Sequence, residues 1–254
     1  IFDEMAKPSP RPRFTVGITD DVSLTSIAYD SDLDVESPDT LRAVFYGLGS
    51  DGTVGANKNS IKILGSVPRT GSTDPFWAQG YFVYDSKKSG SRTVSHLRFG
   101  PEKIKAPYLV SKAGFIGVHH WSILERVDVL EYARKGSVLL VNSPYTSDIM
   151  FDRLPRSMQQ KIIDLGIQVY KINANEVSRA AGLGSRTNTV LQTCFFAISG
   201  VLPADVAIAA VKDAITKTYG KKSADIVTKN HTAVDSAVAH LHKVPVPEQV
   251  TSTH

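Results

Sequence analysis

A glycine-rich segment at residues 47–65, GLGSDGTVGANKNSIKILG, carries the clearest potential for chemistry in this sequence. It follows the apolar run LRAVFY at 41–46, and Gly47, Gly49 and Gly52 fit the pattern G-x-G-x-x-G. Glycine permits positive φ angles and close backbone approach, and the free N–H groups at a helix start attract anions. The segment predicts a phosphate-binding turn, or with equal weight a turn that is only structural.

The charges that follow this segment indicate which phosphate ligand would fit. A dinucleotide site also needs an acidic residue about 20 positions further on, where it binds ribose hydroxyls. Asp85 ends the next expected strand but lies 33 residues after Gly52, and Lys87 and Lys88 follow it. Two ammonium groups favour a further phosphate over a bare ribose, and Lys58 adds to this bias. Neither a Walker A motif nor a thiamine diphosphate motif (GDG followed by Asn) is present.

Other polar residues are weaker candidates. His119 and His120 are adjacent, so on a strand they face opposite ways and make a poor metal pair; we expect solvent or interface roles and no metal site. Asn142, Ser143 and Tyr145 follow the run SVLLV, at a strand end where α/β sheets bind ligands. Loop capping explains these three residues equally well.

Residues 180–189, AAGLGSRTNT, contain a second glycine-rich turn with Arg186 and Asn188. They could face an anion or a partner, although a helix C-cap followed by an N-cap is favoured. Cys194, the single cysteine, lies in the apolar run VLQTCFFAI, which predicts core packing rather than reactivity. No catalytic set is apparent, so no catalytic residue is predicted.

The elements expected around these residues alternate between strand and helix. Such alternation indicates a three-layer, Rossmann-like α/β fold with a mostly parallel sheet and helices on both faces. We expect residues 1–14, with three prolines, to be a linker, 15–243 to be the domain and 244–254 to be a C-terminal linker. The strands are expected at 41–46, 79–85, 93–100, 113–120, 136–145 and 167–173, and the helices at 56–65, 121–134, 154–166, 174–182, 187–202, 204–220 and 223–244.

Composition limits the class of protein. The net charge is +4, without a run of five or six like charges, so nucleic acid is not an expected partner. No apolar run approaches the roughly 20 residues that span a bilayer, so membrane insertion is not expected. One cysteine excludes an internal disulfide and an iron–sulfur cluster held by four thiolates of this chain. A reducing compartment, and hence the cytoplasm, fits best.

Five motifs in order resemble the γ-type domain (domain III) of pyruvate:ferredoxin or pyruvate:flavodoxin oxidoreductases. They are FYGLGSDGTVGANKNSIKI, GYFVYDSKKSG, TVSHLRFGP, LLVNSPY and NTVLQTCFFAISGVLP, and the resemblance runs from Phe14 to Val250. It implies oxidative decarboxylation of pyruvate with coenzyme A to acetyl-CoA and CO2. It also implies that electrons pass to ferredoxin or flavodoxin. The segment between the first two motifs is longer than the family pattern leads us to expect.

The resemblance also implies which cofactors are bound by other domains of the enzyme. Thiamine diphosphate and the [4Fe-4S] clusters belong to other domains of the same polypeptide, the full enzyme is a homodimer, and the isolated chain is inactive. This domain is associated with coenzyme A and covers the thiamine diphosphate site. We carry the coenzyme A role onto Gly49, Ser50, Asp51, Gly52, Asn57, Asp85, Lys87 and Lys88. Two alternatives are an NADP-binding Rossmann-like domain and a non-catalytic interdomain scaffold.

Overall fold

The computed structural model describes residues 1–18, 22–30, 33–84, 90–221 and 223–253. It contains two compact units, 1–36 and 37–254, which we call the arm and the main unit. The arm holds the short helix α1 (Phe2–Met5) and the parallel pair β1 (Thr15–Val16) and β2 (Ser26–Ile27). The buried Glu4 carboxylate pairs with Lys7 and Arg11. The domain limits expected from the sequence, 15–243, stay a prediction.

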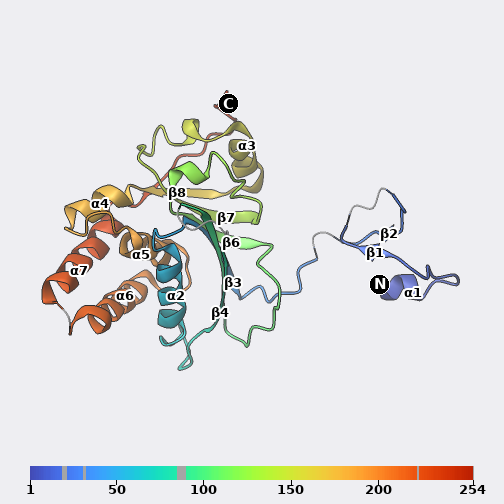
Figure 1. Cartoon of the computed structure of the whole chain (residues 1–254), viewed down its shortest axis with the longest axis horizontal. Helices are drawn as coiled ribbons and strands as arrows, with labels where there is room; N and C mark the ends of the chain where they lie inside the picture. Colours follow the sequence, from blue (N-terminus) through green and yellow to red (C-terminus); the bar gives the residue numbers. More distant parts are fainter. Residues whose placement is uncertain (19–21, 31–32, 85–89, 222, 254) are drawn as a thin grey trace. The chain divides into compact units, whose positions relative to one another are not determined.

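A seven-stranded sheet forms the centre of the main unit, in the order β4-β5-β3-β6-β7-β8-β9 (Figure 1). Strands β3, β6, β7 and β8 pair in parallel, whereas β5 is antiparallel to both β3 and β4, and β9 to β8. The expected mostly parallel sheet is confirmed. The strands are β3 (Leu41–Leu48), β4 (Trp77–Tyr84), β5 (Arg92–Gly100), β6 (Ala113–Val118), β7 (Ala133–Asn142), β8 (Gln168–Ile172) and β9 (His242–Lys243).

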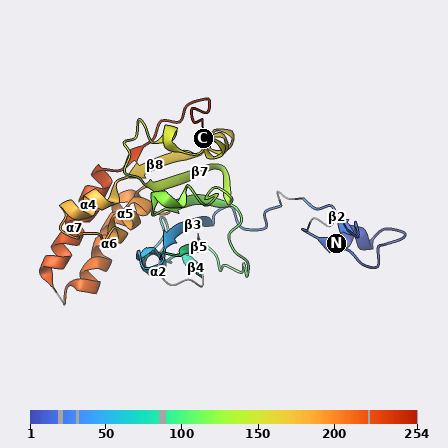
Figure 2. The ribbon, with the colours of Figure 1, turned by 45° about the horizontal axis from the view of Figure 1, so that its top comes forward.

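Helices cover both faces of this sheet, which confirms the three-layer expectation. One face carries α2 (Thr53–Leu64), α4 (Ala174–Ala180), α5 (Asn188–Ile198), α6 (Ala204–Tyr219) and α7 (Ala224–Ala239), which gather on one side in Figures 1 and 2. The other face carries α3 (Arg156–Leu165) and the 3-10 turns η1 (Trp121–Ile123) and η2 (Phe151–Arg153). Among the described residues, no helix is both long and apolar enough to cross a bilayer.

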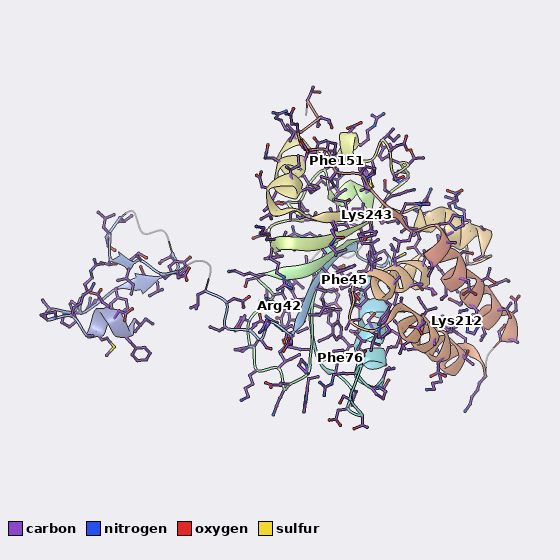
Figure 3. The ribbon with its side chains drawn as sticks, turned by 180° about the vertical axis from the view of Figure 1, so that it is seen from behind. Arg42, Phe45, Phe76, Phe151, Lys212 and Lys243 are labelled. Carbon is purple, nitrogen blue, oxygen red and sulfur yellow. The ribbon has the colours of Figure 1, made fainter. Side chains whose placement is uncertain are left out.

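The core on the first face is built around aromatic rings. Phe45 of β3 lies between the sheet and the helices (Figure 3). Its ring centroid is 5.2 Å from that of Phe195 on α5 and 5.6 Å from that of Phe115 on β6. Next to Phe195, Cys194 has no exposed surface, and burial raises the pKa of its thiol. The expected packing role of Cys194 is confirmed.

One expectation about elements is wrong. The helix expected at 121–134 is absent apart from the short turn η1, and β7 begins at Ala133. The tail that follows β9 makes contacts with α3. Gln159 of α3 accepts hydrogen bonds from the backbone N–H groups of Thr251, at 2.8 Å, and Ser252, at 3.0 Å. Residues 244–253 therefore pack along α3.

Candidate functional site

The glycine-rich turn joins the end of β3 to the start of α2, as its sequence predicts. Asp51 holds it: Oδ2 accepts a hydrogen bond from Leu48 N at 2.7 Å and Oδ1 accepts one from Thr53 N at 2.8 Å. Ser50 has φ +73° and Gly52 has φ +85°, in the left-handed region. The Asp51 carboxylate thus satisfies a free N–H at the helix start that would otherwise attract an anion.

Two of the glycines provide room for internal packing. A Cβ atom at Gly47 would overlap Thr53 Oγ1, and one at Gly52 would overlap Asn188 Nδ2. Asn188 is the first residue of α5, so the turn and the second glycine-rich segment, which are far apart in sequence, meet here. The backbone N–H of Gly49 donates to Ser91 O at 2.6 Å. The turn is therefore held from several sides.

His119 lies beneath the turn and contributes to its support. Its Nδ1 lies 2.7 Å from Thr53 Oγ1, and its backbone N–H donates to Tyr46 O at 2.9 Å. The side chain is only 5% exposed, and burial lowers its pKa to about 4, so the imidazole is neutral at pH 7. The expected solvent or interface role is wrong for His119, whereas His120 is exposed.

The polar residues after β7 have structural partners. Asn142 Nδ2 donates to His119 O at 3.0 Å, and its Oδ1 accepts from Ala174 N at 3.0 Å. Ser143 Oγ accepts a hydrogen bond from Tyr145 N at 3.1 Å. These contacts connect the ends of β6 and β7 to the start of α4, which favours the capping interpretation for Asn142 and Ser143.

Tyr145 lines a cleft of about 660 Å³ on the opposite face of the sheet from α2. Its ring packs edge-on against Trp121 with centroids 4.9 Å apart, and the Arg153 guanidinium lies 5.6 Å from its centroid. The cleft also includes Asp152 and Glu125, so it is aromatic with mixed charges. It is separate from the glycine-rich turn.

The structure places five of the eight predicted site residues at the junction of β3 and α2. Gly49, Ser50, Asp51 and Gly52 form the turn, with Ser50 exposed. Asn57 lies on the inward side of α2 and is 3% exposed, and within the described part of the chain its Nδ2 has no hydrogen-bond partner. Asp85, Lys87 and Lys88 lie outside the described residues.

Sequence reasoning missed Thr53, His119 and Arg92 as neighbours of the turn. Arg92 is exposed and lies opposite Leu48 in the β3–β5 pair, so it adds positive charge beside the turn. Its position within the basic run KKSGSR was a usable signal. Lys58, which the sequence did suggest, is exposed, and its Nζ lies 5.3 Å from the centroid of the Phe82 ring.

The second glycine-rich segment follows the favoured interpretation only in part. Helix α4 ends at Ala180, and Gly182 and Gly184 follow with φ +76° and +62°. Helix α5 begins at Asn188, but the preceding Thr187 makes no side-chain capping hydrogen bond. The role of Asn188 is instead to pack against Gly52. Across the described residues, no group of three or more His, Cys, Asp and Glu side chains is placed to hold a metal ion.

Comparison with known proteins identifies the family to which this chain belongs. Residues 42–240 match the family model described as pyruvate ferredoxin/flavodoxin oxidoreductase. The chain belongs to this family. It is 53% identical over 251 residues to a pyruvate-flavodoxin oxidoreductase of Rhodospirillum rubrum, an alignment that covers 99% of this chain and 21% of the relative. The chain spans about a fifth of the length of the curated relatives it matches.

Two solved structures of the family's fold are similar at low sequence identity. The pyruvate oxidoreductase subunit PORC of Thermotoga maritima matches with a TM-score of 0.63 and 14% identity, covering 82% of this chain and 99% of that one. The 2-oxoglutarate:ferredoxin oxidoreductase of Magnetococcus marinus, solved with 2-oxoglutarate, coenzyme A and succinyl-CoA bound, matches with a TM-score of 0.59 and 15% identity, covering 80% of this chain and 31% of that one. Both likenesses support the fold assignment.

Proposed function

We propose that this chain is a domain of a pyruvate:ferredoxin or pyruvate:flavodoxin oxidoreductase that contributes to coenzyme A binding and covers the thiamine diphosphate site. The whole enzyme would convert pyruvate and coenzyme A to acetyl-CoA and CO2 and pass the electrons to ferredoxin or flavodoxin. The supporting observation is the glycine-rich turn that joins β3 to the start of α2, in a chain that belongs to this family. A neighbour in fold was solved with coenzyme A bound.

The redox groups of this reaction do not fit the residues of the chain. A [4Fe-4S] cluster needs four thiolate ligands, and the chain has a single cysteine, which is buried. The clusters therefore belong to other domains in this proposal. Thiamine diphosphate is assigned to another domain as well, because the sequence lacks the GDG motif followed by Asn. The full enzyme is proposed to be a cytoplasmic homodimer, and this chain by itself is expected to be inactive toward pyruvate.

We assign two kinds of role to the proposed coenzyme A residues. Asp51 and Gly52 set the shape of the turn, because Asp51 is bonded to backbone amides and Gly52 packs on Asn188. Asn57 is buried on α2 behind the turn. Gly49 and Ser50 present the turn to the ligand. Lys87 and Lys88 would supply charge for the phosphates, and Asp85 would hold these lysines when the ligand is absent. The backbone N–H of Gly49 donates a hydrogen bond to Ser91 O, so the chain just before β5 passes beside the turn. This contact supports the proposed role of the lysines, which precede Ser91 by three and four residues.

The test is a calorimetric titration with coenzyme A, in both this chain and the full-length polypeptide that contains it. The Lys87→Glu/Lys88→Glu variant should bind more than about tenfold more weakly, because two attractive charges become repulsive. A matched control is Lys103→Glu/Lys105→Glu, which makes the same charge change in an exposed loop beyond the other end of β5. The control should bind as the wild type does.

The outcomes separate the proposal from its alternatives. Equal affinity in both lysine variants would contradict the assignment of these phosphate contacts. Competition by NADP but not by dephospho-coenzyme A would favour an NADP-binding domain. Absence of binding and of thermal protection in the full-length protein would reject a nucleotide role, since a ligand at 100 times its Kd should add about 2.7 kcal/mol of stability.

One observation favours a second candidate, the interdomain scaffold. The turn is internally satisfied: Asp51 Oδ1 accepts a hydrogen bond from the N–H of Thr53, the first residue of α2, and Gly47 and Gly52 give room to Thr53 and Asn188. These contacts account for two of the glycines without a ligand. A scaffold predicts that Ser50→Ala leaves coenzyme A affinity and pyruvate turnover of the full-length enzyme unchanged. The coenzyme A proposal predicts weaker binding, because the exposed Ser50 hydroxyl is then lost as a hydrogen-bond donor.

A further inference from the structure

The arm, residues 1–36, exposes many more large hydrophobic side chains for its length than the rest of the chain does. Ten large hydrophobic side chains are exposed in it, against eleven in all the described residues after it. A high density of exposed large hydrophobic side chains is typical of an interaction surface in soluble proteins. We define the arm surface by six of these side chains: Phe2 at 86%, Met5 at 64%, Leu24 at 74%, Tyr29 at 60%, Leu33 at 69% and Val35 at 74% exposed.

The arm has little means of burying these side chains itself. Its helix is four residues long and its strands are two residues each. Both hydrophobic clusters found among the described residues are composed of residues from the main unit. A segment this short cannot enclose a core, so its apolar groups gain stability only against another surface.

Charge limits what that surface can be. Residues 1–36 contain eight acidic and three basic residues, a net charge of −5, whereas residues 37–254 contain 17 acidic and 26 basic residues, a net charge of +9. Two arms would repel each other, so an arm-to-arm contact is disfavoured. A surface complementary to the arm would therefore need to be apolar and to carry basic residues.

The extents of the family matches indicate where such a surface belongs. The family model begins at residue 42, so the arm lies outside it. Even so, the Rhodospirillum rubrum relative aligns over 251 residues, which takes in most of the arm, and it is about five times as long as this chain. The arm sequence thus accompanies long polypeptides, which contain further surfaces for it to bind.

We propose that the arm is an intramolecular docking segment, whose apolar and acidic surface binds an apolar surface that carries basic residues on another domain of the same polypeptide. Docking would fix the point at which the chain enters the main unit. This inference concerns an interface, and it holds whether or not the glycine-rich turn binds coenzyme A.

Hydrogen–deuterium exchange of the full-length polypeptide tests the proposal. Amides of residues 22–30 and 33–36 should exchange at least about tenfold more slowly there than in the 254-residue chain alone, because docking orders this segment. The variant Leu24→Asn/Leu33→Asn should restore fast exchange in the full-length protein. It removes two apolar side chains without changing the charge, and both are exposed in this chain.

A matched control makes the same change on the main unit, Val206→Asn/Val238→Asn, at side chains that are 40% and 46% exposed. The control should keep the arm protected. Equally fast arm exchange in the wild-type full-length protein and in the 254-residue chain would overturn the proposal. Protection that appears in the 254-residue chain and rises with its concentration, with a dimer in sedimentation, would also overturn it, because a second copy would then be the partner.

Discussion

Gly52 and Gly55 lie three residues apart, but only Gly52 is in a position that requires glycine. Gly52 has φ +85° and no room for a Cβ beside Asn188, whereas nothing lies within 4 Å of a Cβ at Gly55, inside α2. We expect Gly52→Ala to lower the free energy of unfolding by about 2 kcal/mol or more, from backbone strain and overlap. Gly55→Ala should raise it by about 0.5–1 kcal/mol. Urea denaturation measures both, and similar effects at the two positions would contradict the described turn.

Two buried histidines predict how stability depends on pH. Burial lowers the pKa of His119 to about 4 and that of His96 to about 4, below the usual 6.5. Between pH 6.5 and 4 the unfolded chain therefore binds more protons than the folded chain, so stability falls as the pH falls through this window. Each histidine contributes a slope of up to about 1.4 kcal/mol per pH unit.

Substitution separates the contribution of the histidine beneath the turn. His119→Gln should flatten the dependence of the unfolding free energy on pH between 6.5 and 4, as followed by urea denaturation at several pH values. His242→Gln is the control, since that side chain is exposed on β9 and is not among the groups that act on His119, and it should leave the slope unchanged. An unchanged slope in the His119 variant would place the titrating group elsewhere.

At the residue scale, the sequence correctly predicted the features that depend on neighbouring residues in the chain. The strand–turn–helix at 41–65 and the burial of Cys194 follow from glycine spacing and apolar neighbours. The support of the turn by His119 and Asn188 could not be predicted, because it depends on which elements pack beside β3. The apolar run GFIGV before His119 was a signal that this histidine ends a buried strand.

At the scale of elements, Gln159 and Gln160 make a matched pair on α3. Gln159 has no exposed surface, donates to Phe151 O at 2.6 Å and accepts from two tail amides, whereas Gln160 is exposed and bonds Asp164. Gln159→Ala should speed hydrogen exchange at the N–H groups of Thr251 and Ser252 by about tenfold, since their acceptor is lost. Gln160→Ala should not, and equal exchange in the two variants would refute this anchoring.

The missing helix at 121–134 shows why periodicity alone misled. Its apolar positions, WSILERVDVL, fit a helical stripe, yet Ile123, Leu124, Val129 and Leu130 are all buried around a bend. The Asp128 carboxylate accepts from Leu130 N at 3.0 Å, a local bond that competes with helix formation. The antiparallel strand β5 was expected as a strand, but its direction depends on the hairpin with β4.

At the scale of the whole molecule, the two units predict unequal effects of truncation. Removing residues 1–36 should change the thermal midpoint of the 254-residue chain by less than about 2 °C, because both core clusters lie in the main unit. Removing residues 245–254 should lower it by about 3 °C or more, since the bonds to Gln159 are lost. Differential scanning calorimetry measures both, and a large loss on removing the arm would contradict separate units.

The division into units was only partly visible in the sequence. The prolines at the start suggested a linker, but the net charge of +4 conceals a −5 arm joined to a +9 main unit. The family assignment followed from motifs in their order. The boundary at Glu36 depends on tertiary contacts, which local composition does not specify.

Because Cys194 is completely buried, the folded chain should not react with maleimide reagents. A cysteine introduced at an exposed position would then be the one reactive thiol of the 254 residues. With Tyr29→Cys, for example, a fluorophore or spin label would report from the arm alone, and a second label at Tyr219→Cys would give a distance to the main unit. Distances between two attached labels could thus be measured without first replacing Cys194.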